Sequence, residues 1–449
     1  MKTNLLLAAG LVFSWITSVA QPLEHAEWTR NATLYEVNTR QVTPEGTFNA
    51  FQTHLPRLKE MGVDILWFMP IQPIGVLHRK GVLGSYYSIS DYTAINPEFG
   101  SEYDFEMLVM AAHALEMKVI IDWVPNHTAW DHHWMTEHPD YFWRDAQGII
   151  SNGRNDHDQP TDWTDVAELD YSNDGLQQAM REEMAWWVHR FQLDGFRCDM
   201  AGGVPFDFWA ETNRQLRDLK PELLLLAESN FPGMHRSGFD MTYGWEFHHV
   251  LNKVAGKGES VAALDSYLAK QRKEFPEDAY LMMFIDNHDE NSWNGTVQKR
   301  LGANAQAAFA LCVAWEKSMP LIYNGQEVSL NKSLRFFERD TIDWNGSSQT
   351  DFYSRMMDLK HQHPALANGQ YGGEQIPITT QNDRVYAFSR SKGDNTVLFM
   401  ANFDGNEQKI HYSGAPAGTY TNAITGKKVR WSAKGKKVLP ANSFLFLTR

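Results

Sequence analysis

Short apolar runs of strand length alternate with segments of helical spacing along most of this chain, and the alternation occurs eight times. It is typical of parallel βαβ units, in which helices cover both faces of each strand. The expected strands are residues 33–38, 65–70, 118–123, 195–199, 223–228, 238–242, 281–287 and 320–324. The helical stretches between them include residues 48–61, 104–115, 177–191, 205–219, 260–275 and 304–315. Eight such units predict the α/β class and a (β/α)8 TIM barrel.

Two segments depart from the alternation. Residues 127–170 are polar, rich in His, Asp, Trp and Gly, and have no sustained period, which predicts a small insertion domain after the third strand. Residues 373–449 contain alternating segments and Gly-containing turns without helical spacing, which predicts an antiparallel β-sandwich domain. The barrel is therefore expected to comprise residues 21–126 and 171–372, interrupted by the insertion and followed by the sandwich.

The first twenty residues have the features of a signal peptide. Lys2 gives a positive start, residues 5–16 form an apolar stretch, and residues 18–20 are small enough for a cleavage site. No later stretch approaches the ~20 apolar residues of a membrane span. We therefore expect residues 1–20 to be removed and the mature protein to be exported, either secreted or periplasmic.

Charge and cysteine content narrow the function. The chain of 449 residues has 41 Lys and Arg against 55 Asp and Glu, a formal net charge of −14, which disfavours nucleic acid as a partner. The two cysteines, Cys198 and Cys312, are too few for a disulfide-dense scaffold or a four-cysteine zinc site. One bridge would be compatible with the sequence, but two free, buried thiols are expected.

Four of the predicted strands end in ionisable residues. The carboxyl groups are those of Asp122, Asp199, Glu228, Asp286 and Asp289, and they are accompanied by Arg197, His127 and His288. A single carboxylate at a strand end is usually a helix cap or a solvated loop residue. In a barrel, however, the C-terminal strand ends converge on one face, where active sites lie. The pattern predicts that these side chains meet in one pocket.

Converging carboxyl groups beside an arginine and two histidines suit glycosidic cleavage, in which one acid protonates the leaving oxygen and another supports the reacting carbon. Metal-assisted hydrolysis is the competing chemistry, but it favours paired His and carboxylate ligands at coordination spacing, which these strands lack. The residues His132, His133 and His138 could suggest a zinc site, although an exposed polar insertion explains them better.

Four stretches together resemble the signature regions of the α-amylase family, glycoside hydrolase family 13. They are Asp122-Trp123-Val124-Pro125-Asn126-His127, Gly195-Phe196-Arg197-Cys198-Asp199, Glu228 after a Leu-rich strand, and Phe284-Ile285-Asp286-Asn287-His288-Asp289. Supporting similarity includes Leu34-Tyr35-Glu36-Val37, Tyr87 before Asp91-Tyr92, and Glu168-Leu169-Asp170. The resemblance covers nearly the whole mature chain, and the four regions occur in the family's order.

The resemblance implies a role for each carboxyl group. Asp199 matches the nucleophile, Glu228 the general acid/base, and Asp289 the carboxylate that binds the sugar ring hydroxyls and favours ring distortion. A retaining mechanism follows, with nucleophile and acid about 5–5.5 Å apart. Arg197 is expected to keep Asp199 ionised, and burial is expected to raise the pKa of Glu228.

The resemblance also implies substrate contacts and leaves the metal open. His127 and His288 match residues that hydrogen-bond the sugar at the cleaved position, and Tyr87 matches the ring on which that sugar stacks. Asp122 matches a supporting position. The chemistry needs no cofactor. The question of a structural calcium ion stays open, and the sequence identifies only Asn126 and Glu168 as candidate ligands for it. Calcium takes about six to eight oxygen ligands.

The expected function is retaining hydrolysis of α-1,4-glucosidic bonds in starch, glycogen or maltodextrins. The alternatives are a maltodextrin transglycosylase, an exo-acting maltooligosaccharide hydrolase and, less favoured, a non-catalytic glucan-binding protein. Gly202-Gly203 stand where many relatives carry Lys-His, which leaves binding on the leaving-group side undefined. Residues 325–344, after the last strand, lack a clear counterpart of the family's longer loop, so chain-length preference is also undefined.

Overall fold

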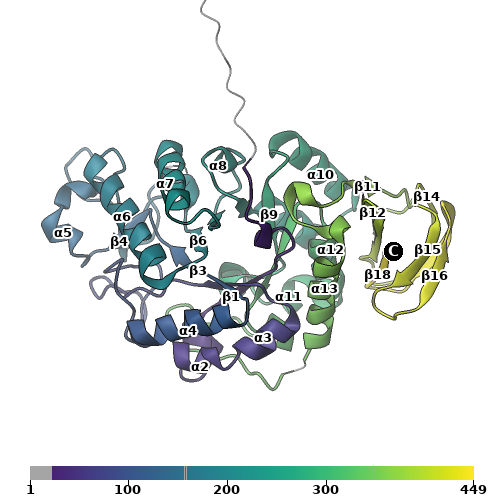
Figure 1. The fold of residues 1–449 in the computed structure, drawn as a ribbon, viewed down its shortest axis with the longest axis horizontal. Coiled ribbons are helices and arrows are strands. Elements are labelled where there is room, and N and C mark those ends of the chain that lie inside the picture. The colour runs from purple at the N-terminus through teal and green to yellow at the C-terminus, as the bar shows by residue number, and fades with distance from the viewer. Residues whose placement is uncertain (1–22, 156, 158, 347) are drawn as a thin grey trace, which may run out of the picture.

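The computed structural model describes residues 23–155, 157, 159–346 and 348–449 (Figure 1). The predicted signal segment, residues 1–20, lies outside these residues. No helix within the described ranges is long and apolar enough to cross a membrane.

Eight parallel strands close into a barrel, as predicted. They are β1 (Leu34–Val37), β2 (Ile65–Phe68), β3 (Lys118–Trp123), β6 (Gly195–Cys198), β7 (Leu224–Ala227), β8 (Met241–Tyr243), β9 (Tyr280–Met283) and β10 (Ser318–Tyr323). Pairing of β1 with β10 closes the ring. Nearly every strand residue is buried, because helices cover the outer face and apolar side chains fill the interior.

The predicted helices, with small shifts, and further helices outside the predicted stretches surround this barrel (Figure 1). The main ones are α4 (Glu102–Ala114), α6 (Asp174–Phe191), α7 (Phe206–Leu219), α10 (Ala262–Glu274), α12 (Ala305–Ala314) and α13 (Thr350–Gln362). Shorter ones are α1 (Thr39–Val42), α8 (Gly233–Arg236), α9 (Trp245–Leu251) and α11 (Val297–Leu301). The single helix predicted over residues 48–61 is wrong: it is two helices, α2 (Phe48–Gln52) and α3 (Leu55–Met61). Pro56 stands in the first turn of α3, because proline is tolerated there but breaks a helix interior.

The seventh strand ends earlier than residue 287. Its ladder with β10 reaches only the pair Met283–Pro320. Residues 284–287 leave the barrel wall as a loop, and His288 and Asp289 begin the helical turn that follows this loop and continues to Asn294.

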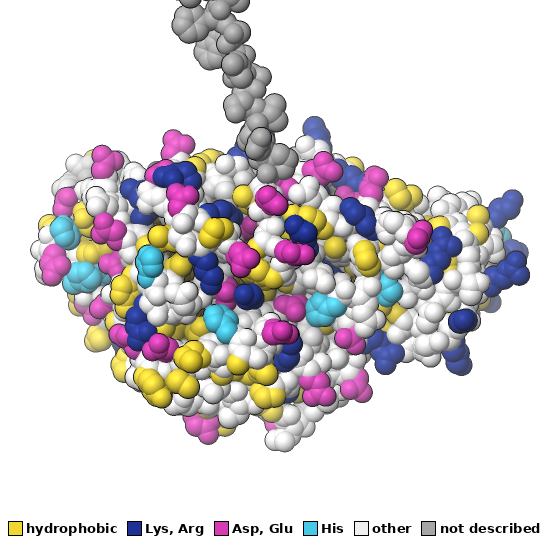
Figure 2. Space-filling view, viewed as in Figure 1, with side chains coloured by type: hydrophobic (Ala, Val, Ile, Leu, Met, Phe, Trp, Pro, Cys, Tyr) yellow, Lys and Arg dark blue, Asp and Glu magenta, His cyan; other side chains and the backbone are white. Residues whose placement is uncertain are grey.

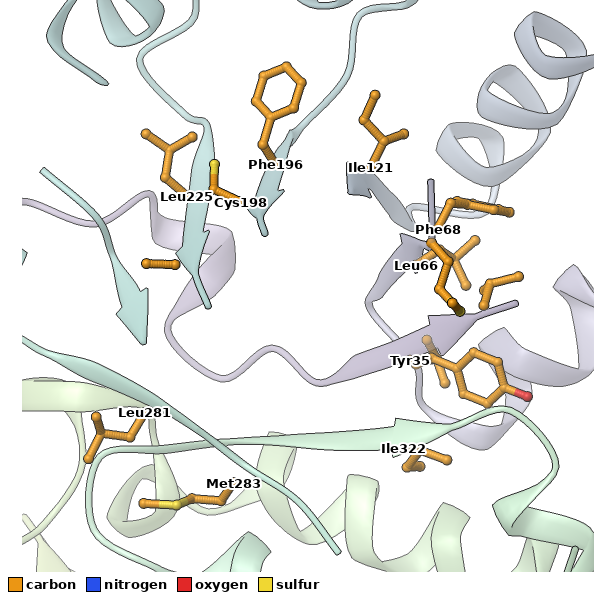
Figure 3. Close-up of a cluster of buried hydrophobic side chains, with 14 of the residues drawn as sticks. Tyr35, Leu66, Phe68, Ile121, Phe196, Cys198, Leu225, Leu281, Met283 and Ile322 are labelled. Atoms are coloured by element: carbon orange, nitrogen blue, oxygen red, sulfur yellow. The ribbon is translucent and has the colours of Figure 1, made fainter. Parts of the chain in front are cut away.

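Two apolar layers lie on either side of the barrel wall. Side chains that alternate along the strands fill the interior, among them Leu34, Trp67, Ile120 and Leu226. The other side chains of the same strands pack outward against the helices, as Tyr35, Leu66, Ile121 and Leu225 do (Figure 3). Cys198 belongs to this outer layer, and both Cys198 and Cys312 are buried and free, as expected.

The two predicted departures from the barrel are present. The segment between β3 and β6 contains the antiparallel pair β4 (His127–Ala129) and β5 (Val166–Glu168) and the short helix α5 (Trp134–Glu137). After α13 the chain is antiparallel: a six-stranded sheet and a two-stranded sheet share one apolar core. Their strands are β11 (Gln375–Pro377), β12 (Val385–Lys392), β13 (Asn395–Asn402), β14 (Gln408–Ser413), β15 (Gly418–Asn422), β16 (Lys428–Trp431), β17 (Lys434–Leu439) and β18 (Ser443–Thr448).

The C-terminal domain joins the barrel through a buried arginine. Arg390, on β12, donates hydrogen bonds to the carbonyl oxygens of Ala314 and Trp315 at 3.1 and 2.7 Å, and to that of Gly373 at 2.8 Å. The domain also differs in charge, because residues 375–449 hold eleven Lys and Arg against four Asp and Glu. Figure 2 shows these basic side chains around the C-terminal lobe. The acidic excess of the chain is therefore carried by the residues that precede it.

Candidate active site

A cavity of about 580 Å³ opens where the C-terminal strand ends converge. Asp199, Glu228 and Asp289 line it, as the sequence predicts. The predicted contact residues Tyr87, His127 and His288 line the same cavity. Asp199 and Glu228 directly follow β6 and β7, whereas Asp289 comes from the helical turn beyond the loop after β9. Three acidic residues that are far apart in the sequence therefore meet in one place.

Arg197 holds two of these acids side by side. Its side chain is fully buried on β6, and its Nη1 lies 2.8 Å from Asp199 Oδ1 and 2.8 Å from Asp122 Oδ1. Its Nη2 lies 2.9 Å from Glu228 Oε2, and its Nε donates to the Tyr243 hydroxyl at 3.0 Å. The planar guanidinium presents several donors in a fixed fork. One rigid group therefore sets the relative position of Asp199 and Glu228.

Five carboxyl groups share this region with two cations. We call the set the carboxyl cluster: it comprises Glu36, Asp122, Asp199, Glu228 and Asp289, together with Arg197 and His288. Like charges that lie close together in a buried site cannot all ionise, so the cluster must retain protons.

Burial is the main influence on each acid in the cluster. It raises the pKa of Glu228, and the charge of Asp199 adds to this effect while Arg197 opposes it. Burial also raises the pKa of Asp199, which Arg197 opposes through its charge and its hydrogen bond. The pKa of Asp122 rises to about 7 for the same reason. At neutral pH we expect the pair Glu228 and Asp199 to consist of one protonated and one ionised carboxyl group.

Glu228 has a second contact, from the backbone. The N–H of Met200 donates to Glu228 Oε2 at 2.9 Å. Met200 has a φ of 46°, in the left-handed region that a side-chain-bearing residue rarely adopts. This strained backbone directs the N–H at the acid. The turn Ala201–Gly203 follows, so the two glycines noted in the sequence present no side chains here.

A hydrogen-bonded chain runs from Glu36 through His288 to Tyr87. His288 Nδ1 lies 2.5 Å from Glu36 Oε1, and His288 Nε2 lies 2.7 Å from the Tyr87 hydroxyl. The hydroxyl in turn donates to Asp122 Oδ2 at 3.1 Å. The charges of Asp289 and Glu36 outweigh burial and raise the pKa of His288 to about 9. His288 is therefore an imidazolium at neutral pH.

The sequence patterns predict no role for Glu36. It was noted only within the Leu34-Tyr35-Glu36-Val37 stretch, yet it is fully buried on β1 beneath His288. An acidic residue inside an apolar strand is costly unless it has a partner. That signal was legible, but the sequence could not identify the partner.

His127 has the opposite character from His288. It is buried at the start of β4, and burial lowers its pKa to about 4. Its ring lies 5.8 Å from the ring of Trp163, another residue of the cavity wall. A neutral imidazole can donate and accept hydrogen bonds with uncharged hydroxyl groups.

The described residues do not fit a calcium ion at Asn126 and Glu168. Glu168 Oε2 accepts hydrogen bonds from the Asn126 amide at 3.0 Å and from the Arg154 N–H at 2.8 Å. Donors therefore face the carboxylate where a cage of about six to eight oxygens would be needed. Within the described ranges, no group of three or more His, Cys, Asp and Glu side chains could hold a metal ion.

The histidines of the insertion form an aromatic contact. The expectation that they are exposed is wrong for His132, which is 1% exposed and stacks on His133 with ring centroids 4.4 Å apart. His132 Nδ1 also accepts the N–H of Trp134, and burial lowers the pKa of this imidazole to about 3. Aromatic packing therefore accounts for its position.

Several aromatic residues of the cavity wall were not identified from the sequence. They are Trp163, Trp293, Phe336 and Phe337, and they come from three separate loops. Trp163 lies in the predicted insertion, Trp293 lies in a stretch with no predicted element, and Phe336 and Phe337 lie within residues 325–344, which lack a clear counterpart of the family's longer loop. Their shared location depends on the fold, so no local motif marks them.

The fold and the cavity define the class of the protein: it is a (β/α)8-barrel glycosidase. Sequence comparison then gives the family. The sequence model described as "Alpha amylase, catalytic domain" matches residues 26–365, and "Alpha amylase, C-terminal all-beta domain" matches residues 378–443. The chain belongs to the α-amylase family, whose members include glycoside hydrolases and transferases.

Individual relatives agree with this assignment. Alpha-amylase MalA of Haloarcula japonica is 29% identical over 424 residues, which cover 91% of this chain and 60% of MalA. The crystal structure of an alpha-amylase from Lactobacillus plantarum superposes with a TM-score of 0.84 at 30% identity, covering 94% of this chain and 99% of that one. An alpha-1,4-glucan:maltose-1-phosphate maltosyltransferase of Burkholderia pseudomallei is 32% identical over 223 residues, 44% of this chain and 19% of the transferase.

Proposed function

We propose that the protein hydrolyses α-1,4-glucosidic bonds of starch, glycogen or maltodextrins with retention of configuration. The observation that carries the proposal is the pair Asp199 and Glu228, held on one arginine at the wall of a cavity that also contains Asp289. Retaining glycosidases need a nucleophile and an acid on either side of one linkage.

In the first step Glu228, protonated, donates its proton to the glycosidic oxygen. The bond from C1 to that oxygen breaks, and the shortened sugar leaves with the proton. A carboxylate oxygen of Asp199 attacks C1 and forms a covalent glycosyl ester. Burial raises the pKa of both acids and Arg197 opposes it at both, but Arg197 adds a hydrogen bond at Asp199, whereas the charge of Asp199 further raises the pKa of Glu228. These two differences support the division of roles.

In the second step water replaces the sugar that has left. Glu228, now ionised, accepts a proton from this water as its oxygen attacks C1, and the bond to Asp199 breaks. Asp199 is released as a carboxylate, and Glu228 regains its proton. The product has the same anomeric configuration as the substrate.

The other residues hold the sugar ring. We expect Asp289 to accept hydrogen bonds from ring hydroxyls, while His288, an imidazolium whose Nε2 lies 3.4 Å from Asp289 Oδ2, keeps a positive charge beside that carboxyl group. His127, a neutral imidazole, contributes from the insertion, and Tyr87 packs against His288 with ring centroids 5.4 Å apart. Positioned donors are worth most where charge develops in the transition state.

Transfer to a sugar acceptor, or exo-acting attack on maltooligosaccharides, is the second candidate. The turn Ala201–Gly203 leaves the acceptor region near Glu228 without long side chains, and one matching relative is a maltosyltransferase. Water and sugar compete for the same glycosyl ester, so both activities use the same residues. Product analysis on maltoheptaose, with and without added maltose, separates transfer from hydrolysis and shows which end is attacked.

The principal test uses two isosteric variants. Asp199→Asn and Glu228→Gln keep the volume of each side chain but remove the nucleophile or the acid, so we expect kcat on maltoheptaose to fall by more than about a thousandfold in each. Circular dichroism and thermal melting check that both variants fold. The matched control is Glu211→Gln on α7, an exposed carboxylate paired with Arg214, which we expect to leave kcat unchanged.

Two results would contradict the proposal. One is near-wild-type turnover in either isosteric variant. The other is release of the β-anomer, which NMR of the first product detects, because inversion requires a different arrangement of acid and water.

A further inference from the structure

An exposed tryptophan stands on the rim of the cavity. Trp293 follows Asp289 by four residues, lines the cavity and is 58% exposed. Its ring lies 5.4 Å from that of Phe336 and 6.0 Å from that of Phe337. We call these three residues the aromatic rim.

The aromatic rim continues a row of rings that begins in the carboxyl cluster. The ring of Tyr87 stacks on the ring of His288. The same tyrosine ring is also nearly parallel to the ring of Phe336, with the two centroids 6.2 Å apart and the two planes at an angle of 10°. Phe336 then contacts Trp293. A row of ring surfaces therefore leads from the carboxyl cluster outward along one wall of the cavity.

Hydrogen bonds fix the two loops of the rim to each other. The Asn291 side chain donates to the carbonyl oxygen of Lys332 at 3.2 Å and accepts the N–H of Leu334 at 2.9 Å. Thr296 Oγ1 donates to Asn331 Oδ1 at 2.8 Å. The turn that carries Trp293 and the loop that carries both phenylalanines therefore form one connected unit.

A third loop supports Phe337 from behind. The carbonyl oxygen of Phe337 accepts a hydrogen bond from the N–H of Leu83 at 3.0 Å. Gly81 has a φ of 64°, and a Cβ at this position would lie 2.4 Å from the Cβ of Phe337. Only glycine permits this approach, so the rim is held in place before any ligand arrives.

The exposed apolar surface of the aromatic rim indicates that it binds a ligand. Trp293, Phe336 and Phe337 are in mutual contact, and a contiguous apolar surface at a cavity mouth, unlike a single exposed ring, marks a ligand-binding groove. The flat apolar faces of pyranose rings match such a surface in shape and polarity, while their hydroxyl groups stay hydrated.

The position of the rim indicates on which side of the cleaved bond it lies. In the proposed function, Glu228 faces the leaving sugar, whereas Tyr87, His288 and Asp289 hold the sugar whose C1 reacts. The row of rings extends from Tyr87 and His288, and the neighbours of Glu228 are instead Arg197 and Met200. The rim therefore lies beyond the sugar that reacts, toward the non-reducing end.

We propose that Trp293, supported by Phe336 and Phe337, is the stacking platform for the second glucosyl unit on the non-reducing side of the cleaved bond. This inference rests on the proposed function for its direction. It makes the protein selective for substrates with at least two glucosyl units on that side.

The test compares two chromogenic substrates that differ by one glucose. 4-Nitrophenyl α-glucoside fills only the reacting position, whereas 4-nitrophenyl α-maltoside also reaches the platform. We expect Trp293→Ala to lower kcat/KM for nitrophenol release about tenfold more with the maltoside than with the glucoside, because loss of an apolar contact costs roughly 10–200-fold in specificity. Trp293→Phe should restore part of the difference. Tyr103→Ala, which removes a 67% exposed aromatic outside the cavity, is the matched control.

Calorimetry makes the test independent of turnover. Maltotriose is titrated into Glu228→Gln and into Glu228→Gln/Trp293→Ala, and we expect about tenfold weaker binding by the double variant. Wild-type protein that cleaves neither maltoheptaose nor the two nitrophenyl substrates contradicts the proposed function, and the calorimetric pair still decides the platform.

Three outcomes overturn the inference. Equal losses on glucoside and maltoside indicate a merely structural role. A loss confined to transfer onto added maltose places the platform on the leaving-group side. Equal affinity of the two Gln-containing variants for maltotriose shows that Trp293 does not contact the sugar.

Discussion

The carboxyl cluster and the aromatic rim share one cavity but are built in opposite ways. The cluster is charged and largely buried, and one guanidinium holds Asp122, Asp199 and Glu228 together at the strand ends. The rim is exposed and apolar, and it is fixed by hydrogen bonds between loops. In the two proposals above, reaction chemistry depends on the barrel itself, whereas selection of the substrate depends on loops that can change without disturbing the barrel.

The comparison predicts that damage to the cluster is severe and damage to the rim is mild. The largest effect is expected from Arg197→Lys. Lysine is a point charge and cannot bridge Asp122, Asp199 and Glu228 at once, so kcat should fall by about a thousandfold or more. Steady-state kinetics on maltoheptaose measure this fall.

Arg390→Lys is the matched control, since Arg390 is equally buried but contacts carbonyl oxygens of the domain junction. It should lower the melting temperature with little change in kcat. An Arg197→Lys variant that keeps kcat within tenfold of wild type would refute the claim that one guanidinium organises the acids.

The next effect tests whether the charge of Glu36 acts through His288. Glu36→Gln keeps the shape of the side chain but removes the charge that helps to raise the pKa of His288 to about 9. We expect kcat/KM to fall roughly tenfold or more at pH 8, with a smaller change at pH 6. In the pH profile, the alkaline limb should move to lower pH. An unchanged alkaline limb would show that Glu36 has only a structural role.

Stability should follow the same group, with a definite sign. A histidine whose pKa is raised in the folded state stabilises the protein fully below its unfolded pKa near 6.5 and loses this contribution as pH rises through about 9. Urea unfolding at pH 6 and pH 9.5 should therefore show a larger loss in wild type than in Glu36→Gln. The difference should be roughly 3 kcal/mol at most.

The smallest effect is expected within the rim. Phe337 supports Trp293 from one side, so Phe337→Leu should raise KM for maltoheptaose by about threefold and leave kcat nearly unchanged. Phe352→Leu, at another aromatic contact outside the cavity, serves as the control. A fall in kcat comparable to that of Arg197→Lys would show that rim and cluster are not separable.

The sequence predicts the cluster better than the rim for a physical reason. Asp199 and Glu228 follow apolar strands directly, and the geometry of a closed barrel brings such positions together. Trp293, Phe336 and Phe337 lie in loops whose paths depend on tertiary hydrogen bonds, so no local pattern marks them.

The misjudged strand end and the role of Glu36 have the same origin. The strand predicted to reach residue 287 stops at Met283, where its ladder with β10, a distant segment of the chain, ends at the pair Met283–Pro320. Glu36 needed a partner that lies 252 residues away in the chain. At both positions the local sequence shows which residues are present, but it does not show which distant residues lie next to them in the fold.

The arginine at the domain junction limits how far this protein can be shortened. Removing the C-terminal sheets would strip the donor from carbonyl groups at the end of α12, and those groups would then face solvent or each other. A catalytic fragment truncated at that boundary would therefore be destabilised by unpaired carbonyl groups at the end of α12. Heat should accordingly melt barrel and sheets together as one cooperative unit.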